Sequence, residues 1–534
     1  MAEPVEQFDL LVIGAGINGA GIARDAAGRG LRVALVERGD LAGATSSASS
    51  KLIHGGLRYL EHREFRLVAE ALAEREVLLS ICGHLAWPLE FVLPHAPHLR
   101  PRWMLSAGLF LYDRLGGRSS LPRSRAVALD EAPYRGILKP EFRHGFAYAD
   151  GWVDDARLVV LNVRDAVDRG AILRLGWEVL GATRIADNGN ASGLWHVETR
   201  ELAGDRRRQI HCRAIVNAGG PWAEEVHRRL LGTDAHPAPG AQSMPRLKHV
   251  KGSHIVVPRL YPGAHAYLLQ HPDRRVVFLI PFGAQCTLIG TTDVDVGEDY
   301  AQPETSAAEV DYLCELVNRY SQRAIRPVDV IWRYSGVRAL ADDGATDASA
   351  VTRDYSLHVD AMTRTDAPLL SVLGGKITTY RALAQTVIDR LAPWIPALRP
   401  TWTARAPLPG ADLGPGGYAG FRRSLLARWP QLDPQMLDGL ARRHGTLTET
   451  VLDGATNPAE LGRDFGGGLH EREVDYLYRR EWVAGQSPAA AVEAILWRRT
   501  KCGLSMTDDQ REAFLSYVSE HPNLPGRSTD AAAV

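Results

Sequence analysis

The sequence has few cysteines, no surplus charge of either sign and no long apolar run. Its five cysteines among 534 residues never form a Cys-x-x-Cys pair, so neither a disulfide framework nor a zinc site is expected. Its 62 basic and 63 acidic residues give a net charge of −1, which argues against a nucleic-acid partner. The cysteine pattern predicts a reducing, intracellular setting and no metal site. No run approaches the roughly 18 apolar residues of a spanning helix, so we expect no membrane span.

What the chain does have is length and an ordinary apolar fraction. With 45% hydrophobic residues, bulk disorder is excluded. At about 150 residues per domain, the length predicts three or four domains and a ligand cleft between them.

The N-terminal segment has the pattern of a strand, a glycine-rich turn and a helix. Residues 8–13 form a short apolar run that is typical of a buried parallel strand. Gly14-Ala-Gly16-Ile-Asn-Gly19 follows, then a helical pattern to Arg29, and a second strand over residues 31–36 ends at Glu37. This order predicts a dinucleotide site, with the pyrophosphate at the helix N-terminus and Glu37 on a ribose hydroxyl. The glycine spacing does not separate NAD from FAD, but its place at the start of a long chain favours FAD.

A loop rich in small hydroxyl residues supports a flavin. Residues 44–51 read Ala-Thr-Ser-Ser-Ala-Ser-Ser-Lys, and Leu-Ile-His-Gly-Gly-Leu-Arg-Tyr follows directly. Small residues allow the backbone to approach a flat ligand closely, and hydroxyls bond phosphates or ring edges. On composition alone, the alternative is a plain Ser/Gly loop without a ligand.

Seven motifs in order give the chain a resemblance to a known family. Ser46-Ser-Ala-Ser-Ser-Lys-Leu-Ile-His-Gly-Gly-Leu-Arg-Tyr-Leu60 resembles the flavin-contacting segment of FAD-dependent glycerol-3-phosphate dehydrogenases, which belong to the glycine/D-amino-acid-oxidase-like superfamily. The other motifs lie at residues 215–223, 251–258, 289–293, 335–340, 352–355 and 374–381. The last 150 or so residues resemble the family's helical C-terminal domain less distinctively.

The resemblance implies an α/β fold with three parts. A discontinuous Rossmann-like FAD-binding domain is expected over residues 1–80, 150–230 and 336–392. A mainly antiparallel substrate (cap) sheet is expected over 81–149 and 231–335, and an all-helical domain over 393–534. We see no chemistry in the helical domain, which we interpret as a packing or docking module.

The periodicity of the sequence predicts individual elements. Helices are expected over 66–79 and 158–167, and strands over 171–175, 193–199, 209–217, 253–257, 275–280 and 286–290. In the C-terminal part, helices are expected over 421–429, 434–443, 471–482, 488–501 and 507–518, with Ser487-Pro488 as one helix start and Thr507-Asp-Asp-Gln510 as a capping box.

The glycine motif, the hydroxyl-rich loop and the resemblance together imply a set of FAD-binding residues. They are Gly14, Gly16, Asn18, Gly19, Glu37, Arg38, Thr45, Ser46, Ser49, Ser50, Lys51, Leu52, His54, Gly55, Gly56, Val179, Ala218, Gly219, Trp222, Gly336, Gly375, Lys376 and Thr378. We expect the cofactor to be non-covalent, although His54 and Cys82 are conceivable attachment points.

The substrate implied by the resemblance is sn-glycerol 3-phosphate, which would be oxidised to dihydroxyacetone phosphate. Its phosphate needs fixed positive charge and its alcohol needs a base. We expect Arg338 and Arg353 on the phosphate, and Arg58, Tyr59 and Lys376 near the hydroxyls and flavin. His254, Lys376 and Arg338 are the expected catalytic residues.

Three residues compete for the role of base. His254 is the leading candidate, because neutral imidazole accepts a proton near pH 7. His54, in the flavin loop, and Lys376, set among arginines, are the alternatives.

A basic strip with an apolar centre lies at residues 99–125. It has six arginines and one aspartate, with Trp103 and Tyr112 at the ends of the apolar part. This pattern favours a short helix lying on an anionic membrane surface, and the alternative is a buried core helix flanked by basic turns. The resemblance implies peripheral membrane binding and ubiquinone as the electron acceptor, and it therefore favours the membrane-surface helix. We therefore expect a cytoplasmic enzyme bound peripherally to the inner face of the cytoplasmic membrane, with a homodimer as an open possibility.

Other functions fit parts of this pattern. They are a glycerol-3-phosphate oxidase that uses oxygen, an FAD-dependent amino-acid oxidase of the same superfamily, and a flavoprotein scaffold whose FAD is only structural.

Overall fold

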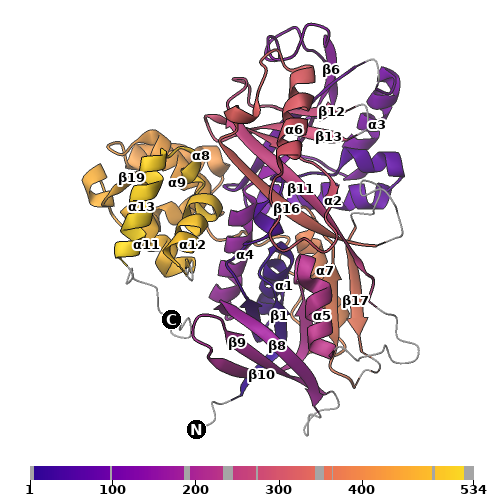
Figure 1. The fold of residues 1–534 in the computed structure, drawn as a ribbon, viewed down its shortest axis with the longest axis vertical. Coiled ribbons are helices and arrows are strands. Elements are labelled where there is room, and N and C mark those ends of the chain that lie inside the picture. The colour runs from indigo at the N-terminus through magenta and orange to yellow at the C-terminus, as the bar shows by residue number, and fades with distance from the viewer. Residues whose placement is uncertain are drawn as a thin grey trace.

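The computed structural model describes the chain except for several short segments. The described residues are 5–96, 99–185, 193–232, 244–271, 275–342, 354–361, 363, 365–483 and 487–521. Figure 1 shows three parts: one sheet with its helices at the bottom, a second sheet above it, and a helical body at one side.

The lower sheet is largely parallel, and we call it the parallel sheet. Its main order is β17-β18-β10-β1-β2-β7, with β9 and β8 added antiparallel beside β10. Leu10, Leu11 and Val12 of β1 are fully buried, as expected of a strand covered on both faces. The bounds are β1 Glu6–Ile13, β2 Val33–Glu37, β7 Ile172–Leu175, β8 Trp177–Ile185, β9 Leu194–Glu201, β10 Arg207–Asn217, β17 Ser356–Asp360 and β18 Leu369–Leu373.

Three helices cover one face of this sheet: α1 (Ile17–Gly28), α4 (Asp155–Asp168) and α7 (Tyr380–Leu391). The small residues of α1 permit close packing, since a Cβ on Gly21 would lie 2.6 Å from the Tyr380 ring. α5 (Ala223–Leu231) packs on β18, β10 and β8.

The upper sheet, which we call the cap sheet, is antiparallel except where β12 runs parallel to β4. The bounds are β3 Leu52–Ile53, β4 Ala86–Pro94, β5 Arg125–Ala128, β6 His144–Val153, β11 Leu247–Pro258, β12 Ala266–Gln270, β13 Val276–Phe282, β14 Cys286–Gly290, β15 Val294–Asp295 and β16 Trp332–Ala341. α6 (Ala307–Tyr320) packs on β11 and β12, and begins with a capping box of Ser306 and Glu309. β16 crosses the predicted domain division at 335/336 and pairs with β11 on both sides of it, so residues 336–341 lie in the cap sheet.

Two helices lie between residues 65 and 115. α2 (Phe65–Ile81) confirms the helix predicted over 66–79. α3 (Arg102–Leu115) contains the apolar part of the basic strip.

The C-terminal domain has its own apolar core. Its helices are α8 Gly417–Arg428, α9 Pro434–His444, α10 Thr448–Leu452, α11 Glu471–Arg480, α12 Pro488–Glu493 and α13 Asp508–Glu520, with a small hairpin of β19 (Asp464–Gly466) and β20 (Leu469–His470). The starts at Ser487 and Thr507 are confirmed, and Thr507 forms the predicted capping box with Gln510. The helix predicted over 488–501 differs: after Glu493 it widens into a π-helical turn, Ala494–Arg499.

Candidate functional site

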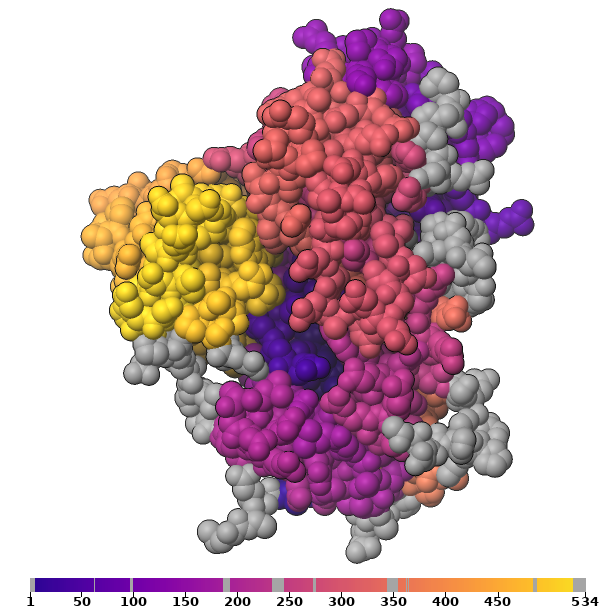
Figure 2. All heavy atoms as spheres, viewed as in Figure 1, coloured from indigo at the N-terminus to yellow at the C-terminus, as the bar shows by residue number. Residues whose placement is uncertain are grey.

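A cavity of about 810 Å³ lies where the parallel sheet, the cap sheet and the C-terminal domain meet. Ile13, Glu37 and Ala218, at or just beyond the carboxyl ends of β1, β2 and β10, line one side of it. Ligands of open parallel sheets bind at such an edge. Figure 2 shows a hollow here, with N-terminal residues (indigo) at its floor and the C-terminal domain (yellow) at one rim.

The glycine-rich turn has the shape that a pyrophosphate cradle requires. Gly14 adopts a φ of +99°, and a Cβ on it would lie 2.7 Å from the Ala218 carbonyl oxygen. Gly16 lines the cavity as the N-cap of α1. Gly19 faces the turn itself, because a Cβ there would lie 1.9 Å from the Gly14 oxygen. The turn thus presents bare backbone to the cavity, while Gly19 serves the close packing of the helix on the turn.

Glu37 ends β2 and faces the same cavity. Its carboxylate accepts hydrogen bonds from the N–H groups of Ala15 (2.7 Å) and Gly39 (2.8 Å). Burial raises its pKa, and these two hydrogen bonds oppose the shift. The carboxylate is therefore held in place beside the turn, where the sequence predicts a ribose contact.

The hydroxyl-rich loop is tied to the cap sheet and to helices α1 and α4. Thr45 donates a hydrogen bond to the Val337 carbonyl (2.7 Å), and Ser46 accepts one from the Ile17 N–H (2.9 Å). Ser49 donates to Asp155 (2.8 Å), which also pairs with Lys51 at 2.8 Å. The loop is thus a fixed wall of the cavity.

Most predicted cofactor residues line the cavity. They are Gly14, Gly16, Asn18, Glu37, Arg38, Thr45, Ser46, Ser49, Ser50, Leu52, His54, Val179, Ala218, Gly219, Trp222, Gly336, Gly375, Lys376 and Thr378.

Four predicted cofactor residues are not part of the lining. Gly19 packs inside the turn, and Lys51 is fully buried against Asp155. The Gly55 N–H donates to the Tyr112 hydroxyl (2.9 Å), and Gly56 adopts a φ of +74° beside the Tyr59 ring. These four positions shape the turn and the loop from behind the lining.

Arg338 enters the cavity from β16 at a place cleared by glycines. Its guanidinium pairs with Asp293 and donates to Thr291 Oγ1 (3.3 Å). Gly252 lies opposite Gly336 in the β11–β16 register, and a Cβ on Gly252 would lie 2.5 Å from the Arg338 guanidinium. Glycine at 252 is therefore required for the arginine to reach this position.

His254 lies on the neighbouring stretch of β11 and also lines the cavity. Its Nε2 is 2.8 Å from the Ser50 hydroxyl, and its ring stacks on Tyr334 at 4.9 Å. A Cβ on its register partner Gly290 would lie 2.0 Å from the ring. Burial, reinforced by the charges of Lys51 and Arg338, holds its pKa well below the usual value, so the imidazole is neutral near pH 7.

Lys376, Tyr59 and His54 also line the cavity. The Lys376 ammonium lies 3.8 Å from the centre of the Tyr59 ring, a cation–π contact. The His54 ring meets Phe278 edge-on at 6.3 Å. The cavity thus brings together both alternative bases and His254.

Two predicted substrate residues are not placed there. Arg58, in the 3₁₀ segment Leu57–His62, is not among the lining residues. Arg353 lies outside the described residues. Cys82, a conceivable attachment point, is buried in α1's core cluster and donates to the Leu78 carbonyl instead of facing the cavity.

Sequence reasoning missed a contribution from the C-terminal domain. Ala490, Ala494 and Arg498 line the cavity, and Asp40 pairs with Arg498 (2.9 Å) and Arg499. The signal in the sequence was the basic cluster Trp497-Arg-Arg-Thr-Lys501 inside an apolar helix. Asp293, the partner of Arg338, was also missed, although it ends the motif at 289–293.

Helix α3 differs from the all-round apolar helix expected of the basic strip. Leu109 and Tyr112 are each 2% exposed, and the Tyr112 hydroxyl donates to Asp150 (2.7 Å). Tyr112 is therefore a core residue, not an interfacial anchor. Trp103 (69%), Phe110 (59%) and Leu111 (39%) are exposed on the same helix. Among the described residues, no helix is long and apolar enough to cross a bilayer.

Two buried polar atoms in the lining, Asn18 Oδ1 and His254 Nδ1, have no hydrogen-bond partner among the described residues. Together with the bare backbone at Gly14 and Gly16 and a volume in the upper part of the usual ligand range of about 300–1,000 Å³, they fit a dinucleotide cofactor with a small substrate beside it.

Comparison with known proteins also indicates an FAD-dependent enzyme. The family model for FAD-dependent oxidoreductases matches residues 9–381. A glycerol-3-phosphate dehydrogenase of Pseudomonas aeruginosa is 47% identical over 521 residues, which cover 97% of each chain. A D-erythritol 1-phosphate dehydrogenase of Brucella abortus is also 47% identical, over 97% of this chain and 98% of its own.

A solved structure has the same architecture. The glycerol-3-phosphate dehydrogenase of Bacillus halodurans, complexed with FAD, superimposes with a TM-score of 0.65 at 25% identity, covering 97% of this chain and 95% of its own.

Proposed function

Because the chain belongs to the family of FAD-dependent oxidoreductases that includes the glycerol-3-phosphate dehydrogenases, we propose that it oxidises sn-glycerol 3-phosphate to dihydroxyacetone phosphate. The observation that carries the proposal is the convergence of Arg338, His254 and Lys376 on one cavity that also contains the glycine-rich turn. An anion-binding group and a proton acceptor beside a flavin site are what oxidation of a phosphorylated alcohol needs.

FAD, when bound, supplies the acceptor for the hydride from the alcohol carbon. The backbone at Gly14 and Gly16 and the N-terminus of α1 would hold its phosphates, and Glu37 would hold a ribose. The hydroxyl-rich loop and residues 374–378 would line the flavin end.

Arg338 would bind the phosphate group of the substrate, and Lys376 would orient the substrate hydroxyls. Asp293 and Thr291 hold the Arg338 guanidinium at the cavity. A planar guanidinium meets phosphate oxygens in pairs and stays charged at any physiological pH. Arg353, predicted as a second phosphate ligand, stays a prediction, and Arg58 is better regarded as a neighbour of the site.

His254 would accept the alcohol proton. Its neutral imidazole has a buried Nδ1 without a partner among the described residues, while Ser50 and Tyr334 fix the ring. Burial lowers its pKa most, and the charges of Lys51 and Arg338 lower it further. A bound phosphate dianion would offset those two charges and make the ring more basic. His54 and Lys376 remain the alternatives.

A membrane surface and ubiquinone complete the proposal. The exposed Trp103, Phe110 and Leu111 give α3 an apolar face, with arginines at both of its ends. Such a helix lies in the interfacial plane, where an amphiphilic quinone is accessible. We therefore place the enzyme peripherally on the inner face of the cytoplasmic membrane.

D-erythritol 1-phosphate is a second candidate substrate, because a relative of that name is as similar as the glycerol-3-phosphate dehydrogenase. Turnover with a dye as electron acceptor separates the two. We expect kcat/KM for sn-glycerol 3-phosphate to exceed that for D-erythritol 1-phosphate, and unphosphorylated glycerol to react poorly. The reverse order would reassign the substrate, and activity confined to glycine or D-alanine would refute the proposal. Peroxide formed in equal amount with oxygen alone would establish an oxidase instead.

A further inference from the structure

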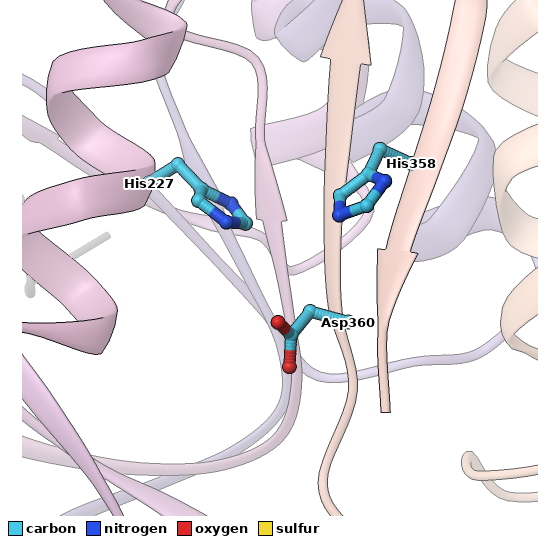
Figure 3. A group of neighbouring side chains, drawn as sticks. All are labelled: His227, His358 and Asp360. Atoms are coloured by element: carbon cyan, nitrogen blue, oxygen red, sulfur yellow. The ribbon is translucent and has the colours of Figure 1, made fainter. Parts of the chain in front are cut away.

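Two histidines and one aspartate form a cluster outside the cavity. His227 comes from α5, and His358 and Asp360 come from the edge strand β17. Their candidate ligand atoms all lie within 4.8 Å of one another. Figure 3 shows the two imidazole rings pointing toward each other from helix and strand, with the Asp360 carboxylate beside them. The function proposed above uses none of these groups.

We propose that His227, His358 and Asp360 bind one divalent transition-metal ion of the zinc type, with water completing the coordination. Two imidazole nitrogens and one carboxylate oxygen are a ligand set that Zn²⁺ accepts, and harder ions such as Mg²⁺ prefer all-oxygen sites. The sequence predicted no metal site, because the three residues come from segments about 130 residues apart and form no short motif.

The alternation of β17 explains why its two ligands share one face. His358 and Asp360 are two residues apart, so both side chains point to the side that α5 covers. Leu357 and Val359 point the other way and pack on the core beneath α1 and α7. His227 lies on the sheet-facing stripe of α5, together with the buried Ala223 and Leu230.

Neighbouring groups orient the ligands, as metal sites require. His227 Nδ1 lies 3.2 Å from the Ser371 hydroxyl, and Ser371 is the register partner of His358 on β18. A proton on Nδ1 satisfies this contact and leaves the Nε2 lone pair for the ion. Arg184 donates to Asp360 Oδ1 (2.7 Å), which fixes the carboxylate and leaves Oδ2 for coordination.

The local electrostatics keep both imidazoles in the form that binds metal. Burial lowers the pKa of His227 and of His358, and the mutual proximity of the rings lowers that of His227 further. Asp360 opposes the shift in both, and Arg184 adds to it for His227. Both rings are therefore neutral near pH 7, so an ion need not displace protons from them.

An ion at this place would tie a helix of the cofactor cavity to the edge of the parallel sheet. Trp222, Glu225, Val226 and Arg229, on or next to α5, line the cavity. Since the ion would bind the folded chain only, it should raise the thermal stability.

Isothermal titration of the tag-free, EDTA-treated holoenzyme with ZnCl₂ tests the proposal. We expect one site per chain in the wild type and no such site in His358→Ala. Asp360→Asn should weaken binding by about tenfold or more. ZnCl₂ should also raise Tm by a few degrees in the wild type and not in His358→Ala.

His196→Ala is the matched control. His196 and His211 form another histidine pair, with nitrogens 3.0 Å apart, but no third ligand joins them among the described residues. This variant should bind Zn²⁺ as the wild type does. Absence of binding in the wild type, unchanged binding in His358→Ala, or loss of binding in His196→Ala would each overturn the proposal. If His358→Ala loses its flavin or its fold, His227→Asn and Asp360→Asn decide the question in the same way.

Discussion

Gly252 and Gly290 leave the space that two side chains of the site, Arg338 and His254, occupy. A Cβ at either position would overlap Arg338 or His254, with separations of 2.5 Å and 2.0 Å. The absence of these two side chains on β11 and β14 lets a guanidinium and an imidazole share one end of the cavity. Alanine at either glycine should therefore displace the Arg338 guanidinium or the His254 imidazole, although neither of these residues is itself changed.

At the residue scale, His254 carries the proposed proton transfer. His254→Ala should lower the rate of flavin reduction in single turnover by on the order of 10² or more. His249→Ala is the control, because His249 is on the same strand and buried but does not line the cavity. A near-wild-type rate in His254→Ala would exclude this histidine and leave His54 and Lys376 as candidates.

Arg338 carries the proposed recognition of phosphate. Arg338→Ala should raise KM for sn-glycerol 3-phosphate by about 10- to 100-fold, since a charge-assisted hydrogen bond contributes about 1.5–3 kcal/mol. Any residual turnover of glycerol should change little. Arg333→Ala, an exposed arginine on the same strand, should behave as the wild type.

Removing Arg338 also takes a partner from Asp293, so the double variant Arg338→Ala/Asp293→Asn separates binding from folding. The double variant should regain the thermal stability of the wild type, whereas its KM for sn-glycerol 3-phosphate should stay as high as that of Arg338→Ala. Equal losses for glycerol and glycerol 3-phosphate would make Arg338 a structural residue.

The sequence identified these residues through motifs, and its errors have physical reasons. Lys51 and Gly55 lie in the flavin-loop motif, but burial against Asp155 and Tyr112 turns them into supports of the loop. Asp293 and Arg498 reach the site through pairing across distant segments, which no local spacing reveals.

At the scale of single elements, α3 illustrates how packing selects one face of an apolar helix. Its sequence is apolar almost all round, so periodicity left both a core helix and a surface helix open. The structure has both: Leu109 and Tyr112 are buried, while Trp103 and Phe110 are exposed. Which residues were buried depended on the cap sheet, whose strands β4 and β6 the sequence pattern did not reveal.

The exposed face of α3 predicts membrane attachment. Trp103→Glu with Phe110→Glu should release the protein from vesicles that contain anionic lipid in a flotation assay, because two charges would enter the acyl region. Val328→Glu with Ile331→Glu is the control: these residues are 76% and 49% exposed and belong to the segment after α6, not to α3. Unchanged flotation of the α3 variant, or release of the control instead, would show that α3 is not the anchor.

At the scale of the whole molecule, the C-terminal domain docks through ion pairs that are buried or largely buried. Arg157 pairs with Glu481, Lys501 with Asp154, and Arg499 with Asp40, and all three pairs join this domain to the parallel-sheet part of the chain. Composition and helix patterns predicted a separate helical domain. They could not predict that its π-helical turn would close one side of the cavity.

This docking predicts that the C-terminal domain supports cofactor retention. Asp40→Asn would leave Arg498 and Arg499 without this partner next to the loop at residues 43–46, at a cost on the order of 3 kcal/mol. We expect a lower Tm and an apparent Kd for FAD raised by about tenfold or more, measured by flavin fluorescence. Arg428→Ala, which breaks an exposed pair with Glu449 inside the domain, should change neither noticeably. An unchanged FAD affinity in Asp40→Asn would show that the domain does not support the cofactor.

The activity proposed for this cavity is the oxidation of a phosphorylated alcohol at a bound flavin. Anaerobic titration of the FAD-loaded wild-type enzyme with sn-glycerol 3-phosphate tests it most directly. We expect this substrate to bleach the flavin absorbance with one equivalent of dihydroxyacetone phosphate formed per flavin, while glycine and D-alanine leave the absorbance unchanged. A flavin that sn-glycerol 3-phosphate does not bleach, or that glycine or D-alanine bleaches instead, would exclude this activity.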